Sequence, residues 1–124
     1  MNNLKLEKYL NDNRTLNFNE LLFSFIDNEN LKDSDVYRKI NMDRKLFSKI
    51  RCDFNYIPKK TNVIKLCLSL NLNLMDTNKL LNSAGYSLAY NDEFDLVISY
   101  CIENNIYDLN DVNTYLYAYT NSTL

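Results

Sequence analysis

Histidine is absent from this chain of 124 residues, and glycine and proline occur once each. Without histidine the chain lacks the usual base, metal ligand and proton shuttle near neutral pH. One glycine, Gly85, cannot build a glycine-rich phosphate loop. Strands and hairpins need more turn residues than Gly85 and Pro58 supply, so the composition favours helices throughout. We therefore expect an all-α protein that is not an enzyme and holds no cofactor and no metal.

Cysteine is also sparse, and long apolar runs are missing. The chain has an odd number of cysteines with no CxxC spacing, namely Cys52, Cys67 and Cys101. Each lies in or beside an apolar helical pattern, which predicts buried free thiols in a reducing cytoplasm. No stretch resembles a signal peptide or approaches the roughly 18 apolar residues of a membrane span. With 46% apolar side chains the chain can bury one core of ordinary size. We expect a cytoplasmic single domain over residues 1–124 with no membrane contact.

The basic residues are concentrated in one stretch of the chain. Nine of the fourteen lie between Arg38 and Lys65, where Asp43 and Asp53 are the only acids. This stretch has a formal charge of +7, whereas the rest of the chain, with five bases and fourteen acids, has −9. An anionic partner such as duplex DNA would be attracted to one face and repelled by the other, and its binding would depend steeply on salt.

Within the basic stretch, the apolar pattern predicts two short helices, over 34–40 and 44–51, joined by a tight turn. Asn41 tolerates the left-handed conformation that such a turn requires. Met42 is expected in the core between the helices, and Asp43 is expected to cap the second helix. The pattern is typical of a helix-turn-helix with an exposed recognition helix.

The remaining sequence predicts further helices on both sides of this unit. Leu4, Leu6, Tyr9 and Leu10 are expected on one face of a first helix that packs as an arm. Asn17 and Glu20 form a capping box for the next helix. The helix that starts near Thr61 is apolar almost all round and belongs in the centre. A helix over 74–84 should end at Gly85, and two helices follow from Asp92, where the carboxylate pairs 92/93 and 108/111 are interpreted as helix-start residues.

The candidate DNA-binding residues follow from charge and position. We expect residues 44, 45, 48 and 49 to enter the major groove and the other bases to contact phosphates. Lys59 and Lys60 also lie near a helix N-terminus, where backbone amides attract anions. The full candidate set is Arg44, Lys45, Ser48, Lys49, Arg51, Lys39, Lys59 and Lys60.

The run from Val36 through Gly85 resembles the Cro/C1 type of helix-turn-helix, the XRE-like family. The matching positions are Asn41 for the turn glycine, Met42 for the core aliphatic, Asp43 for the capping serine, 48–50 in the recognition helix, and Pro58. Almost the whole chain also resembles a module appended to macrodomain-type proteins of Firmicutes. The resemblance implies a lambda-repressor-like core over 16–88, wrapped by an N-terminal helix and a C-terminal helical pair over 89–124. It further implies a transcriptional regulator that binds duplex DNA.

Two functional hypotheses remain open. The first is a DNA-binding regulator that acts as a homodimer, because one recognition helix reads few base pairs. The second is a protein-protein module, or an anti-defence inhibitor from a phage or mobile element, that keeps the fold and binds a protein target. The acidic tail suits either partner-binding role through Tyr107, Tyr115, Tyr117 and Tyr119. The alternative interpretation is that tyrosines 100, 107, 115 and 119 close the core of the last two helices.

Overall fold

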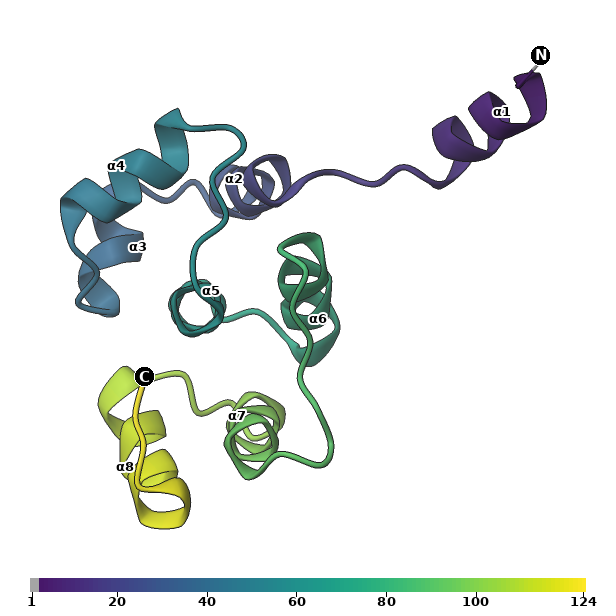
Figure 1. The fold of residues 1–124 in the computed structure, drawn as a ribbon. Helices are drawn as coiled ribbons and strands as arrows, with labels where there is room; N and C mark the ends of the chain where they lie inside the picture. Colours follow the sequence, from purple (N-terminus) through teal and green to yellow (C-terminus); the bar gives the residue numbers. More distant parts are fainter. Residues whose placement is uncertain (1–2) are drawn as a thin grey trace.

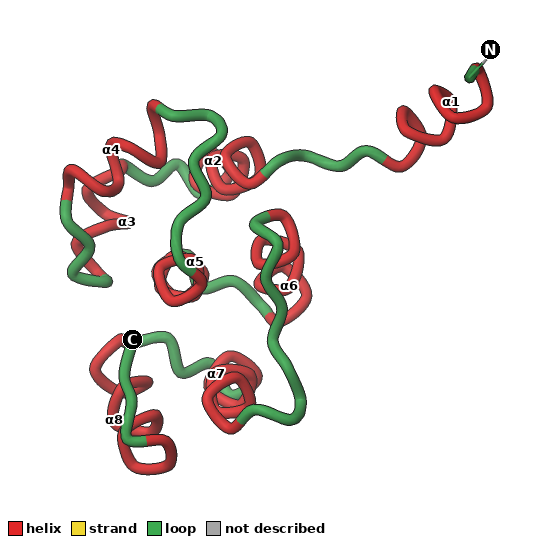
Figure 2. Tube along the Cα trace, viewed as in Figure 1, coloured by secondary structure: helices red, strands yellow, loops and turns green. Residues whose placement is uncertain are grey.

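The structure is a computed structural model that describes residues 3–124, and every regular element in this range is a helix (Figures 1 and 2). The all-α prediction is therefore confirmed. The helices in chain order are α1 (Leu4–Asn13), α2 (Phe18–Asn28), α3 (Asp33–Lys39), α4 (Arg44–Cys52), α5 (Lys60–Ser69), α6 (Leu74–Ser83), α7 (Glu93–Glu103) and α8 (Leu109–Thr120).

Helix α5 lies at the centre of the molecule, as its uniform apolar character predicts. Figure 1 shows it surrounded by α2, α3 and α4 on one side and by α6, α7 and α8 on the other. Six of its ten residues are buried, including Ile64 and Cys67, which are fully inaccessible. A helix buried on most of its circumference draws its stability from packing on every side rather than from one amphipathic face.

Five helices end in the same way. After α2, α3, α5, α6 and α7, a residue with positive φ is followed by an apolar residue whose N–H donates to the carbonyl five positions earlier. This is the Schellman arrangement, in which glycine is the usual left-handed residue. Among these five positions only Gly85 is a glycine. The other four are asparagines with φ between 51° and 57°, namely Asn30, Asn41, Asn71 and Asn105. The predicted left-handed turn at Asn41 is confirmed.

Side-chain caps define the starts of α2, α4, α6, α7 and α8. Asn17 accepts from Glu20 N at 2.9 Å while the Glu20 carboxylate accepts from Asn17 N, so the capping box at α2 is present. Asp92 and Asp108 cap α7 and α8 through their carboxylates. These two helices pack against each other and form the expected C-terminal pair. Their acidic residues therefore have a structural role at helix N-termini.

Three expectations about packing are wrong. Helix α1 has no buried residue and projects away from the other helices, joined to α2 by an extended linker over 14–17, so it does not wrap the core (Figure 1). Cys52 is exposed, whereas Cys67 and Cys101 are buried. Tyr115 and Tyr119 do not close the core of the C-terminal pair, because Val112 and Leu116 fill that position. Apolar spacing identifies a helical face but not what covers it.

Candidate nucleic-acid interface

Helices α3 and α4 meet through the turn at residues 40–43. Met42 is 7% exposed and lies in the core, as predicted. The Asp43 carboxylate accepts from Lys45 N at 3.1 Å and starts α4. The Phe47 ring contacts Phe23 edge-on, with centroids 6.0 Å apart, and Tyr37 at 5.6 Å. These contacts fix the orientation of α4 on the rest of the fold.

Helix α4 has one buried face and one exposed face. Phe47 and Ile50 are buried, whereas the opposite side carries the outer face of α4, which we define as Arg44, Lys45, Ser48 and Lys49. All four residues are exposed, and none of the three bases forms an ion pair with another residue in the range 3–124. The Lys49 ammonium lies 4.5 Å from the centre of the Tyr56 ring, which restrains it without neutralising its charge.

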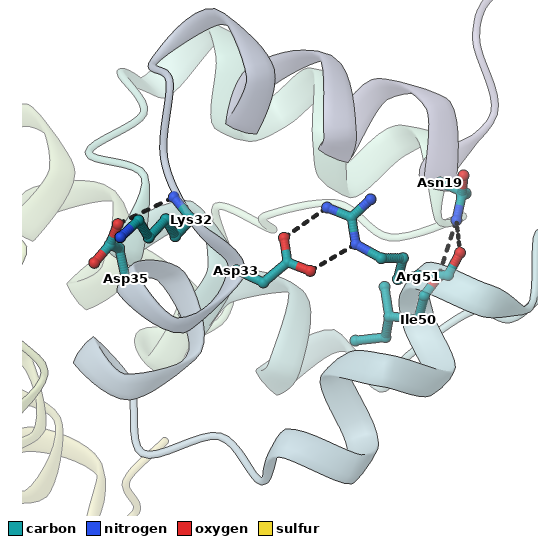
Figure 3. Close-up of polar contacts among 6 residues, drawn as sticks. All are labelled: Asn19, Lys32, Asp33, Asp35, Ile50 and Arg51. Atoms are coloured by element: carbon teal, nitrogen blue, oxygen red, sulfur yellow. Dashed lines mark hydrogen bonds and ion pairs between the residues drawn. The ribbon is translucent and has the colours of Figure 1, made fainter.

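Arg51 differs from the other bases of α4 because its guanidinium is paired within the fold. Nε and Nη2 donate to the two carboxylate oxygens of Asp33, both at 2.6 Å (Figure 3). These hydrogen bonds raise the pKa of Arg51 above its already high usual value. The guanidinium carbon also lies 4.1 Å from the centre of the Phe23 ring. Arg51 therefore links the end of α4 to the start of α3 and to α2.

Asn19 holds the same end of α4 from the opposite side. Its side-chain amide donates to the Ile50 carbonyl at 2.8 Å (Figure 3). The carbonyls of the last turn of a helix have no partner within that helix, so this bond satisfies one of them. Neither Asn19 nor Asp33 was predicted from the sequence. They lie 31 and 18 residues from their partners, and no local pattern marks such pairs.

The flanking bases also fall into two kinds. Lys39 and Lys59 are exposed. Lys60, in contrast, places Nζ 2.7 Å from Asp95 Oδ2, and that carboxylate side chain is 3% exposed. The same oxygen accepts from Ala89 N at 2.8 Å. Lys60 therefore connects α5 to α7, and its charge is paired with the Asp95 carboxylate within the protein.

A groove of about 560 Å³ is lined by residues of both α3 and α4. Arg44 and Ser48 line it from α4, and Lys32 and Ser34 line it from the start of α3. Bases and hydroxyls that face one groove suit an anionic group such as a backbone phosphate. Asp33 also lines it, but its carboxylate is already bound to Arg51.

The tyrosines of the C-terminal pair form a separate surface. Tyr117 and Tyr119 are 62% and 71% exposed. A groove of about 390 Å³, which we call the tyrosine groove, runs between α7 and α8 and is lined by Leu96, Val97, Tyr100, Tyr115 and Tyr119. Tyr107 does not belong to it, because its hydroxyl donates to the Leu72 carbonyl at 2.9 Å and burial raises its pKa. Tyr107 therefore holds the loop between α7 and α8 to the turn before α6.

Comparison with protein-family models, with curated proteins and with solved structures gives no match for this chain. Among residues 3–124, no helix combines the length and apolar character that a bilayer crossing requires.

Proposed function

We propose that this chain is a small DNA-binding helix-turn-helix protein, a transcriptional regulator that acts as a homodimer. In this proposal α2–α6 form a lambda-repressor-like core, and the outer face of α4 enters the major groove. The observation that carries the proposal is that Arg44, Lys45 and Lys49 lie together on one exposed helical face without acidic partners. A structural role would pair these charges, as it pairs Arg51.

The number of unpaired basic side chains sets the expected salt dependence of DNA binding. Lys39 and Lys59 add to the three bases of α4, so one chain offers about five phosphate contacts. Each contact releases a counterion, which predicts a slope of about −4 to −5 in log K against log salt for each chain. Arg51 and Lys60 are not included, because their charges are already paired. Ser48, which carries no charge and is not part of this count, is the side chain proposed for base edges.

The distribution of charge over the molecule supports one direction of approach. Helices α4 and α8 lie at opposite ends of the group formed by α2–α8 (Figure 1). The sequence from Leu66 onward contains one base and seven acids, so the end with α7 and α8 repels a polyanion. DNA would therefore reach the protein from the α4 end.

The test is a titration of fluorescent duplex DNA at two salt concentrations. The variant Lys45→Glu with Lys49→Glu should abolish binding and leave Tm nearly unchanged, because both side chains are exposed. Its control is Lys79→Glu, a charge reversal on α6, away from both α4 and α1, which should retain binding. Binding that survives in the α4 variant, or is lost equally in the control, would overturn the assignment of α4 as the recognition helix.

A second candidate is a protein-binding module that keeps the fold without groove contacts. The exposed aromatic side chains of α8 favour it, since tyrosine is enriched in interfaces. The acidic first turn of α3, with Asp33 and Asp35, also sits unfavourably beside a DNA backbone. This candidate predicts no salt-sensitive DNA binding by the unmodified protein. It also predicts a defined protein partner that Tyr117→Ala with Tyr119→Ala fails to retain.

A further inference from the structure

Helix α1 carries an apolar face that nothing in the described structure covers. Leu6, Tyr9 and Leu10 share one side of the helix at the i, i+3, i+4 spacing and are 52%, 64% and 44% exposed. A helix with one apolar face is stabilised by burying that face against a partner. The helix has no buried residue of its own, so a partner must supply the cover.

The tyrosine groove has a complementary composition. Its lining is mostly apolar, and it includes the rings of Tyr100 and Tyr115, whose centroids lie 6.1 Å apart. Grooves between two helices are a common docking site for a third amphipathic helix. Residues 80–124 carry six acidic side chains and no Lys or Arg, so the occupant of this groove should carry positive charge.

Residues 4–14 have a net charge of +1, because Lys5, Lys8 and Arg14 outnumber Glu7 and Asp12, and this sign is opposite to that of the residues around the groove. Lys5 in α1 and Arg14 directly after it lie on either side of Leu6, Tyr9 and Leu10, nine positions apart, which is about 14 Å at the helical rise. Glu93 and Glu103 lie on either side of the groove residues of α7, ten positions apart, or about 15 Å. All four charged side chains are exposed, and none forms an ion pair with another described residue.

The position of α1 directs it to another molecule. The linker over 14–17 has four residues and can span at most about 14 Å. It leads into α2, and α5 and α6 separate α2 from the C-terminal pair (Figure 1). This arrangement favours docking of α1 on another molecule over docking in the groove of its own chain.

We propose that α1 of one copy docks in the tyrosine groove of a second copy, and that two copies exchange their α1 helices in a symmetric dimer. Each copy then provides one arm and one groove, so the assembly closes at two chains. This inference rests on the homodimer of the proposed function but not on DNA contact by α4. The two are therefore tested separately.

The first experiment measures the mass of the full chain in solution, without DNA, over a wide concentration range. The wild-type chain should dimerise, and Leu6→Lys with Leu10→Lys should weaken the dimer by roughly 100-fold or more, because two apolar side chains lose their cover. The control is Met75→Lys, at an exposed apolar residue on α6, which should dimerise as wild type does. A monomeric wild type overturns the homodimer, whereas a dimer that survives the α1 variant overturns the docking of α1 alone.

The second experiment exchanges the charges. An arm variant, Lys5→Glu with Arg14→Glu, and a groove variant, Glu93→Lys with Glu103→Lys, should each dimerise weakly alone. When the two are mixed, both interfaces pair opposite charges again, so the heterodimer should form at close to wild-type strength. Circular dichroism checks that each variant is folded. If mixing restores nothing, α1 either docks within its own chain or occupies another surface, and the proposal fails.

Discussion

Lys59 and Lys60 are adjacent and carry the same charge, yet we predict opposite consequences when each charge is removed. Lys60 Nζ lies 2.7 Å from the buried carboxylate of Asp95, whereas Lys59 is exposed. The change Lys60→Met keeps the aliphatic stem and removes the ammonium. The Asp95 carboxylate then retains the N–H of Ala89, at 2.8 Å, but loses its counter-charge.

The size of the effect follows from the burial of the pair. Breaking a fully buried ion pair costs about 3–5 kcal/mol. Because the Lys60 side chain is 32% exposed, water solvates part of the site, and we expect a loss of about 2–3 kcal/mol in the free energy of unfolding. In a chain of this length, that loss lowers Tm by about 10 °C. Lys59→Met should shift Tm by no more than about 2 °C and instead weaken DNA binding.

Thermal and urea unfolding followed by circular dichroism measure the stability effect, and fluorescence anisotropy with duplex DNA measures binding. A third variant tests the cause. Lys60→Met combined with Asp95→Asn leaves no unpaired buried charge and keeps an acceptor for the Ala89 N–H, so it should be more stable than Lys60→Met alone. Equal unfolding temperatures for the two single lysine variants would contradict the role of the Lys60–Asp95 ion pair, and so would a double variant no more stable than Lys60→Met.

Three further predictions concern single side chains. Asn41→Ala should lower the free energy of unfolding by about 1 kcal/mol in urea titrations, because alanine tolerates a φ of 51° poorly. Asn41→Gly should stay within about 0.5 kcal/mol of wild type. An alanine variant as stable as wild type would contradict this prediction. A thiol reagent should modify Cys52 rapidly and should modify Cys67 and Cys101 only after unfolding, since only Cys52 is exposed. Rapid modification of all three cysteines in the folded protein would contradict the burial of Cys67 and Cys101. Burial raises the pKa of Cys67 from 9.0 to about 12, so between these pH values the unfolded chain loses a proton that the folded chain keeps. Stability should therefore fall as pH rises above 9, and Cys67→Ala should remove up to about 1.4 kcal/mol per pH unit from that slope; parallel slopes for the two proteins would exclude this linkage.

Much of the fold was predictable because its signals are local. The capping box of Asn17 and Glu20, the caps at the starts of the later helices, and the apolar character of α5 all lie within a few residues of the elements they define. The left-handed turn at Asn41 was predicted because asparagine tolerates the conformation that the turn between the two helices requires. The same signal, an asparagine followed by an apolar residue, also ends α2, α5 and α7 and was available in the sequence.

The candidate site was only partly predictable because residues far away in the sequence determine which of its basic side chains are paired. Arg51 and Lys60 have the same local surroundings of bases and apolar residues as Lys49 and Lys59. Their partners, Asp33 and Asp95, are 18 and 35 residues away and meet them only in the folded chain. Composition locates a basic stretch, but tertiary structure decides which bases remain free to bind a ligand.

The asparagines that end four helices in place of glycine also have a consequence for the gene. Every glycine codon begins with two guanines, whereas both asparagine codons begin with two adenines. A gene poor in guanine and cytosine can therefore encode these helix ends without losing their backbone geometry, since asparagine accepts the same conformation. The nucleotide bias of such a genome and the architecture of this protein are thus compatible at the positions where the chain must reverse direction.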